Sequence, residues 1–141
     1  MVHITTSRRG VAVVAAIALV VLGVVAWSAT RSGSAPADLG TRTTRAGEVE
    51  VTMTALTLDH SGAVFGVEFD THTVELGLDP ATAVMTVNGT QAGGAAWDGS
   101  GPGGHHREGT LRFTTPVPSG AAVELRITGL PQDAIGTWTA P

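Results

Sequence analysis

The chain has 141 residues, of which 43% are hydrophobic and 14% charged, with 19 glycines, no cysteine and a formal net charge of −4. The lack of cysteine excludes a disulfide framework, a thiolate metal site and a cysteine nucleophile. The net charge conceals two opposite parts, because residues 1–45 carry five arginines against one aspartate and residues 46–141 carry eleven carboxylates against three arginines.

An apolar segment comes first in the chain. Residues 11–29 are uncharged and consist mainly of Ala, Val, Leu and Ile. About 20 apolar residues in a helix cross the hydrocarbon layer, so the segment predicts a transmembrane helix in contact with the lipid bilayer. Arg8 and Arg9 precede it directly, and the positive-inside rule places residues 1–10 in the cytoplasm. We expect a single-pass plasma-membrane protein whose C-terminal domain is extracytoplasmic.

A cleaved signal peptide is the alternative interpretation of this segment. Ala26-Trp27-Ser28 before Ala29 forms an acceptable small-x-small cleavage site. The apolar run is longer than the ~7–15 residues typical of a signal peptide, which favours an uncleaved signal anchor. Both interpretations export the remainder of the chain.

The segment after the anchor predicts a flexible linker. Residues 30–47 are rich in Ser, Thr, Gly, Ala and Arg, and they show no apolar periodicity. Such a composition lacks the apolar surface to offset the entropy of ordering. The expected organisation is a cytoplasmic region at 1–10, a signal anchor at 11–29, a linker at 30–47 and an exported β-sandwich domain at 48–141.

From residue 48 onward the hydrophobic residues recur with a period of two, which is typical of half-buried strands. The turn signals Asp59-His60-Ser61-Gly62 and Asn88-Gly89 separate such runs. Residues 93–104 predict a glycine-rich loop around Trp97. The predicted strands cover residues 48–55, 64–70, 83–87, 110–114, 121–128 and 135–139.

Short strands with turn signals every ~8–12 residues and no amphipathic helix are typical of β-sandwiches. We therefore predict an all-β, immunoglobulin-like antiparallel sandwich preceded by one N-terminal transmembrane helix. The Cys-Trp-Cys hallmark of antibody domains is absent from this cysteine-free chain.

Histidines mark two motifs of the exported part. A Thr-His pair at residues 71–72 follows a predicted strand, and a Trp-Asp-Gly triplet at 97–99 precedes Gly-Gly-His-His-x-x-Gly-x-Leu-x-Phe at 103–113. This pattern resembles a family of uncharacterised exported prokaryotic β domains, over residues 49–127. The resemblance implies a secreted or anchored β domain and no particular reaction.

His72, His105 and His106 are the candidate metal ligands, because two or three imidazoles with a carboxylate suit Cu²⁺ or Zn²⁺. Adjacent residues of a regular strand point to opposite faces, so joint ligation requires His105 or His106 to lie in the glycine loop. In the alternative interpretation, His105 donates to loop carbonyls and Thr71-His72 caps a strand end. Both contacts would pin the glycine-rich loop.

No nucleophile, base and orienting group can be placed together, so we do not expect an enzyme. Three arginines against eleven carboxylates in residues 46–141 predict no nucleic-acid binding. The leading hypothesis is a membrane-anchored extracytoplasmic domain that interacts with an envelope protein. The alternative function is a histidine-based copper or zinc binding domain.

Overall fold

The computed structural model describes residues 39–141. The predicted cytoplasmic region, the predicted membrane segment at 11–29 and most of the predicted linker lie outside the described residues. Within residues 39–141, no helix has the length and hydropathy that a membrane span requires.

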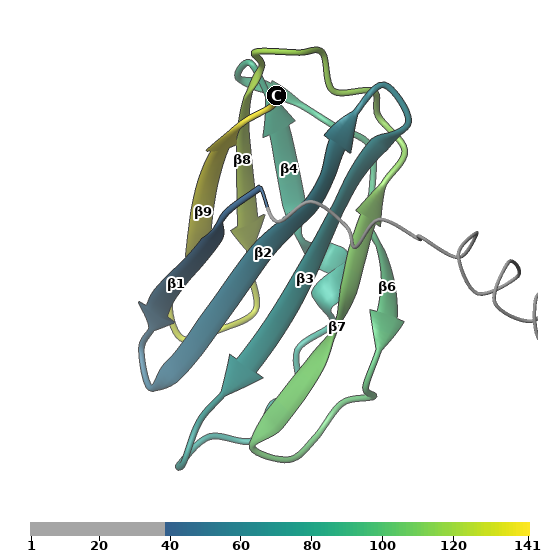
Figure 1. Ribbon diagram of the computed structural model, residues 1–141. Coiled ribbons are helices and arrows are strands. Elements are labelled where there is room, and N and C mark those ends of the chain that lie inside the picture. The colour runs from purple at the N-terminus through teal and green to yellow at the C-terminus, as the bar shows by residue number, and fades with distance from the viewer. Residues whose placement is uncertain (1–38) are drawn as a thin grey trace, which may run out of the picture. The chain divides into compact units, whose positions relative to one another are not determined.

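Two antiparallel sheets make up the described part of the chain (Figure 1). The five-stranded sheet has the order β1-β2-β3-β7-β6 and contains β1 (Thr41–Ala46), β2 (Val49–Asp59), β3 (Gly62–Asp70), β7 (His106–Phe113) and β6 (Ala96–Gly99). The four-stranded sheet has the order β5-β4-β8-β9 and contains β5 (Thr90–Gln91), β4 (Val84–Val87), β8 (Ala122–Ile127) and β9 (Ala134–Thr139). One turn of 3₁₀ helix, η1 (Pro80–Thr82), precedes β4. The prediction of an all-β antiparallel sandwich is confirmed.

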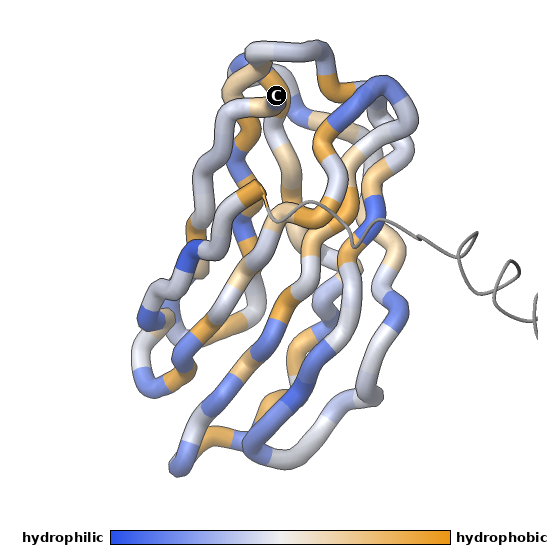
Figure 2. The backbone as a smooth tube through the Cα atoms, in the orientation of Figure 1, coloured by the Kyte–Doolittle hydropathy of each residue, from blue (hydrophilic) through white to orange (hydrophobic). Residues whose placement is uncertain are grey.

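The alternating sequence pattern explains which side chains form the core. The positions that the period of two places on the inner face are buried along β2, β3, β7 and β8. Figure 2 shows the alternation of hydrophobic and hydrophilic positions along the strands. Phe65 packs against Phe113 and Trp138, with ring centroids 6.2 and 5.1 Å apart. Burial of each large apolar side chain contributes about 1.5–3 kcal/mol, so these inner faces hold the sheets together.

All six predicted strands are present, but the sequence-based boundary of the domain is wrong. β1 lies within residues 30–47, which were predicted to be a flexible linker. Only Ala46 of this edge strand is buried, so an alternating apolar signal is missing. Its order comes from pairing with β2 and from the opposite sheet, since the Trp138 indole donates to the Gly40 carbonyl at 2.8 Å.

The glycine-rich segment also differs from its prediction as a continuous loop. Residues 96–99 form β6, which pairs with β7 from Ala96↔Arg112 to Gly99↔Gly109. This strand pairs glycine with glycine, so it lacks the alternating side chains by which strands are recognised.

Backbone hydrogen bonds fix the rest of the glycine-rich loop against the connection between β3 and β4. The amides of Thr71 and Leu76 donate to the carbonyls of His105 and Gly104, both at 2.9 Å, and the Gly103 amide donates to Leu76 at 2.8 Å. These three bonds place both histidine motifs at the same end of the sandwich.

We predict that Gly62→Ala destabilises the domain far more than Gly89→Ala. Both glycines have positive φ, at 126° and 79°, but a Cβ at Gly62 would collide with the Phe113 carbonyl oxygen, whereas the space at Gly89 is open. We expect a loss of about 3 kcal/mol for Gly62→Ala and about 1 kcal/mol for Gly89→Ala. Thermal unfolding of the full chain, followed by circular dichroism, measures the difference. Equal melting temperatures for the two variants would contradict the turn geometry.

Candidate functional site

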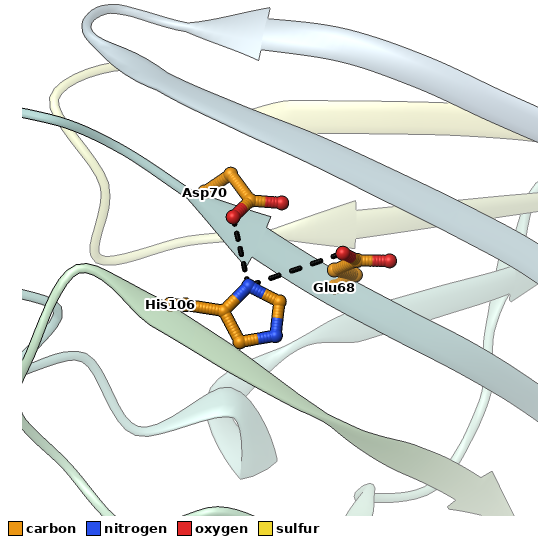
Figure 3. Close-up of side chains that lie close together, drawn as sticks. All are labelled: Glu68, Asp70 and His106. Atoms are coloured by element: carbon orange, nitrogen blue, oxygen red, sulfur yellow. Dashed lines mark hydrogen bonds and ion pairs between the residues drawn. The ribbon is translucent and has the colours of Figure 1, made fainter.

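An imidazole and two carboxylates meet on the outer face of the five-stranded sheet. The antiparallel register pairs Asp70 of β3 with His106 of β7 and Glu68 with Glu108. These positions have the parity opposite to the buried residues, so their side chains point outward. Figure 3 shows one nitrogen of the His106 ring facing the carboxylates of both Asp70 and Glu68.

The short contact of this cluster joins His106 Nδ1 to Asp70 Oδ1 at 2.7 Å. A carboxylate only accepts, so Nδ1 carries the hydrogen and donates it. Glu68 Oε1 lies 3.9 Å from the same nitrogen, and Glu108 Oε2 lies 3.9 Å from Nε2 on the other side of the ring. The side chains of His106, Asp70 and Glu68 are 47–52% exposed, so solvent and ions reach the cluster.

The hydrogen bond between Asp70 and His106 shifts the pKa values of both groups in opposite directions. It raises the pKa of His106 above the ordinary 6.5, and the negative charges of Asp70, Glu68 and Glu108 add to this shift. The same hydrogen bond lowers the pKa of Asp70 below the ordinary 3.8. At a pH between the lowered pKa of Asp70 and the raised pKa of His106, the pair is therefore a carboxylate and an imidazolium.

This cluster also has the donor set of a divalent metal site. One ligand atom from each of Glu68, Asp70 and His106 lies within 4.8 Å of the other two. Ligands around a tetrahedral Zn²⁺ lie about 3.3 Å apart, so exposed side chains need only small rotations to converge. Imidazole nitrogen with carboxylate oxygens suits Zn²⁺ and Cu²⁺, once the ring nitrogen has lost its proton.

The predicted set of three histidine ligands is corrected by this arrangement. Of the candidates, only His106 belongs to the cluster, and among residues 39–141 His72 and His105 form no metal-ligating group with it. His105 precedes β7 and lies in the loop, where its Nδ1 donates to the Val74 carbonyl at 3.1 Å. The two neighbouring side chains therefore contact different parts of the domain, His105 the connection after β3 and His106 the outer face of the sheet.

Two residues of the histidine motifs, Thr71 and His105, make local hydrogen bonds of the kind that the structural alternative predicts. Besides the bond from His105 to Val74, the Thr71 hydroxyl oxygen accepts from the amides of Thr73 and Val74, both at 3.4 Å. Thr71 and His105 thus hold the connection after β3 against the glycine-rich loop.

Sequence reasoning missed Glu68 and Asp70 as partners of His106. Their outward parity was visible, and so was that of His106 and Glu108. Their proximity depends on the pairing of β3 with β7, two strands separated by 35 residues of chain between Asp70 and His106. A pattern within one strand carries no information about this pairing.

The cluster borders an open depression on the same outer face. The depression has a volume of about 580 Å³, and its walls include Glu68 and Glu108. Gly66 has no side chain here, and the flanking threonines are short, so the surface of the sheet is hollowed. The threonines in this wall are Thr52, Thr54 and Thr110.

No protein-family model, curated protein or solved structure matches the chain. The resemblance to exported prokaryotic β domains therefore stays a prediction that rests on the motifs alone.

We predict that the His106 ring titrates above pH 6.5 and that Asp70→Asn brings its midpoint back toward that value. The asparagine removes the negative charge that stabilises the imidazolium, and its neutral amide oxygen is a weaker acceptor than the carboxylate. NMR titration of the ring resonances measures the midpoint. Asp98→Asn on β6 is the matched control, and it should leave the midpoint unchanged. A midpoint unaffected by Asp70→Asn would refute the assignment.

The same pair gives a pH dependence of stability. The raised pKa of His106 stabilises the fold fully below pH 6.5, and this contribution is lost as the pH rises through the folded-state pKa. The lowered pKa of Asp70 contributes above pH 3.8 and is lost as the pH falls through its folded-state value. In Asp70→Asn, the contribution of Asp70 disappears and that of His106 becomes smaller, because the charges of Glu68 and Glu108 remain.

Proposed function

We propose that the chain is a single-pass plasma-membrane protein that displays a binding domain, rather than an enzyme, outside the cell. The open depression on the outer face of the five-stranded sheet carries this proposal. Threonine hydroxyls, carboxylates and a solvent-exposed imidazole offer hydrogen-bonding groups to a partner there.

The sandwich belongs, in this proposal, to the immunoglobulin-like type. The orders β2-β3-β7-β6 and β9-β8-β4-β5 correspond to A-B-E-D and G-F-C-C′ of immunoglobulin domains, with β1 as an additional edge strand. Domains of this architecture commonly present binding surfaces on a rigid scaffold. That analogy of fold supports a binding role without naming the partner.

The membrane part of the proposal rests on the sequence. Residues 11–29 are apolar and uncharged, and Arg8 and Arg9 hold the preceding residues in the cytoplasm. We propose a transmembrane signal anchor at 11–29 and an extracytoplasmic position for the sandwich. The partner on the outer face is then an envelope protein that supplies hydrogen-bond donors or basic side chains to Glu68 and Glu108.

Single-cysteine variants test both the topology and the binding face, because the chain has no cysteine of its own. Ser61→Cys reports on the exposed turn between β2 and β3, and Glu108→Cys reports on the outer face, where the Glu108 side chain is 74% exposed. A membrane-impermeant maleimide should label both variants in intact cells. Labelling of Ser61→Cys only after lysis would refute the extracytoplasmic position.

The ratio of the two labelling rates tests the binding face. In the purified full chain, both cysteines should react at similar rates because both sites are exposed. In intact cells, we expect Glu108→Cys to react at least about tenfold more slowly than Ser61→Cys, because a partner covers the outer face. An identical ratio in cells and in the purified chain would refute binding at this face.

Binding of a divalent metal is the second candidate function, and the Glu68, Asp70 and His106 cluster favours it. A metal ion would replace the hydrogen of His106 Nδ1 and be held between the two carboxylates. Cu²⁺ and Zn²⁺ match the donor set. A bound ion would also lower the negative charge beside the depression and so alter its choice of partner.

Calorimetric titration of the full chain with Zn²⁺ and with Cu²⁺ tests the metal site. We expect His106→Ala to weaken binding by at least about tenfold, because loss of a residue that only orients a metal ligand already commonly lowers affinity by 10–100-fold. His72→Ala and His105→Ala are matched controls that should retain the affinity of the parent chain. Equal losses in all three variants, or no binding by the parent chain, would contradict this site.

A further inference from the structure

Arg107 is a charged side chain buried in the core. It lies on the inward parity of β7, in register with Phe69, and is 2% exposed. Burial of a charge without a counter-ion is costly, so such groups are normally paired with an opposite charge. Within residues 39–141, Arg107 forms no ion pair. The guanidinium therefore lacks the negative partner that its position calls for.

The hydrogen bonds of Arg107 use only part of its donor capacity. Nη1 donates to the carbonyls of Leu76 and Leu78, at 3.1 and 2.7 Å, and Nη2 donates to Ser100 at 3.0 Å. A guanidinium has five N–H donors, so two remain. One of them is Nε, which is buried and has no hydrogen-bond partner. An unpaired buried donor is uncommon in folded proteins.

A small pocket lies beside this guanidinium, and Arg107 forms part of its wall. Its volume is about 240 Å³. Apolar atoms of Leu78, Pro80 and Pro102 line it together with the Trp97 indole. The pocket thus combines an apolar interior with a cation that has no charged partner.

Trp97 is held firmly in this wall. Its indole Nε1 donates to the Ser100 carbonyl at 3.1 Å, and the Arg107 guanidinium carbon lies 6.0 Å from the ring centroid. The paired glycines Gly99 and Gly109 leave room for the ring, because a Cβ at either would collide with it. The aromatic surface is therefore fixed before any ligand enters.

We infer that this pocket binds a monocarboxylate attached to a small apolar or aromatic body. The carboxylate would accept the remaining Nη2 hydrogen of Arg107, since the Nε atom is buried, and the body would pack against Trp97. Asp79 also lines the pocket, and its negative charge repels phosphates and other multiply charged anions more strongly than it repels a monocarboxylate. The pocket shares Gly99 and Ser100 with the wall of the depression, but Arg107 and Trp97 line only the pocket, so this inference does not rest on the proposed function.

Two sources can supply this chemistry, a free organic acid and the C-terminal carboxylate of a peptide. Benzoate represents the first, and N-acetylglycylphenylalanine represents the second. Benzamide is the neutral counterpart of benzoate and controls for partition into detergent. Binding of either acid supports the inference, and the ratio of their affinities assigns the source.

The experiment follows the Nε–H resonance of Arg107 in ¹H–¹⁵N spectra of the full chain in a nonionic detergent. We expect benzoate or the peptide to shift this resonance saturably, and benzamide to bind at least about tenfold more weakly, because it lacks a charge-assisted hydrogen bond. No shift at about 10 mM of either acid, or equal binding of benzamide, would overturn the inference.

Glycine variants block the pocket without removing Arg107. Gly77 and Gly101 line the pocket, and a Cβ at either meets no atom within 4 Å, so Gly77→Leu and Gly101→Leu should fold. We expect each to weaken acid binding by about tenfold or more. Gly94→Leu has equally open surroundings away from the pocket and should bind as the parent does. Equal weakening by Gly94→Leu would overturn the assignment to this pocket.

Discussion

The pairing of β3 with β7 is the constraint on which the described domain depends. It joins the first hairpin to the second half of the chain in an unbroken register from Ala63↔Phe113 to Asp70↔His106. One register sets both faces at once, because a shift by a single residue would exchange them. The outward face receives the carboxylates and His106, and the inward face receives Arg107 beside the aromatic core. The cluster and the pocket are therefore two results of the same alignment.

The period of two in the sequence was sufficient to predict the strands that have one buried and one exposed face. β2, β3 and β8 alternate clearly, and each lies where the pattern indicated. The sequence pattern did not predict the edge strands β1 and β6, because their order comes from the strands beside them. β1 has one buried residue, and β6 pairs a glycine with a glycine of β7. Local sequence records burial well, but it does not record hydrogen bonding to a distant strand.

For the candidate site, the sequence pattern predicted which face of the sheet each side chain occupies, but not which side chains of different strands lie close together. His106 was correctly placed outward, and His105 lies in the loop before β7. The partners Glu68 and Asp70 required knowledge of which strand lies beside β7. Arg107 carried a signal that was overlooked, since it shares the parity of Leu111 and Phe113. A charged residue at an inward position of a strand indicates either that the predicted faces are exchanged or that a charge is buried. Arg107 is a buried charge.

The free edges of the five-stranded sheet affect how closely such domains can crowd together. At one edge, β1 carries exposed arginines, and at the other, β6 spans only Ala96–Gly99. Charge and shortness both discourage strand-to-strand pairing between copies. In the proposed membrane-anchored state, the protein would be confined to two dimensions, where collisions between like surfaces are frequent. A domain with these edges can be present at high surface density and still keep its outer sheet face free for a different molecule.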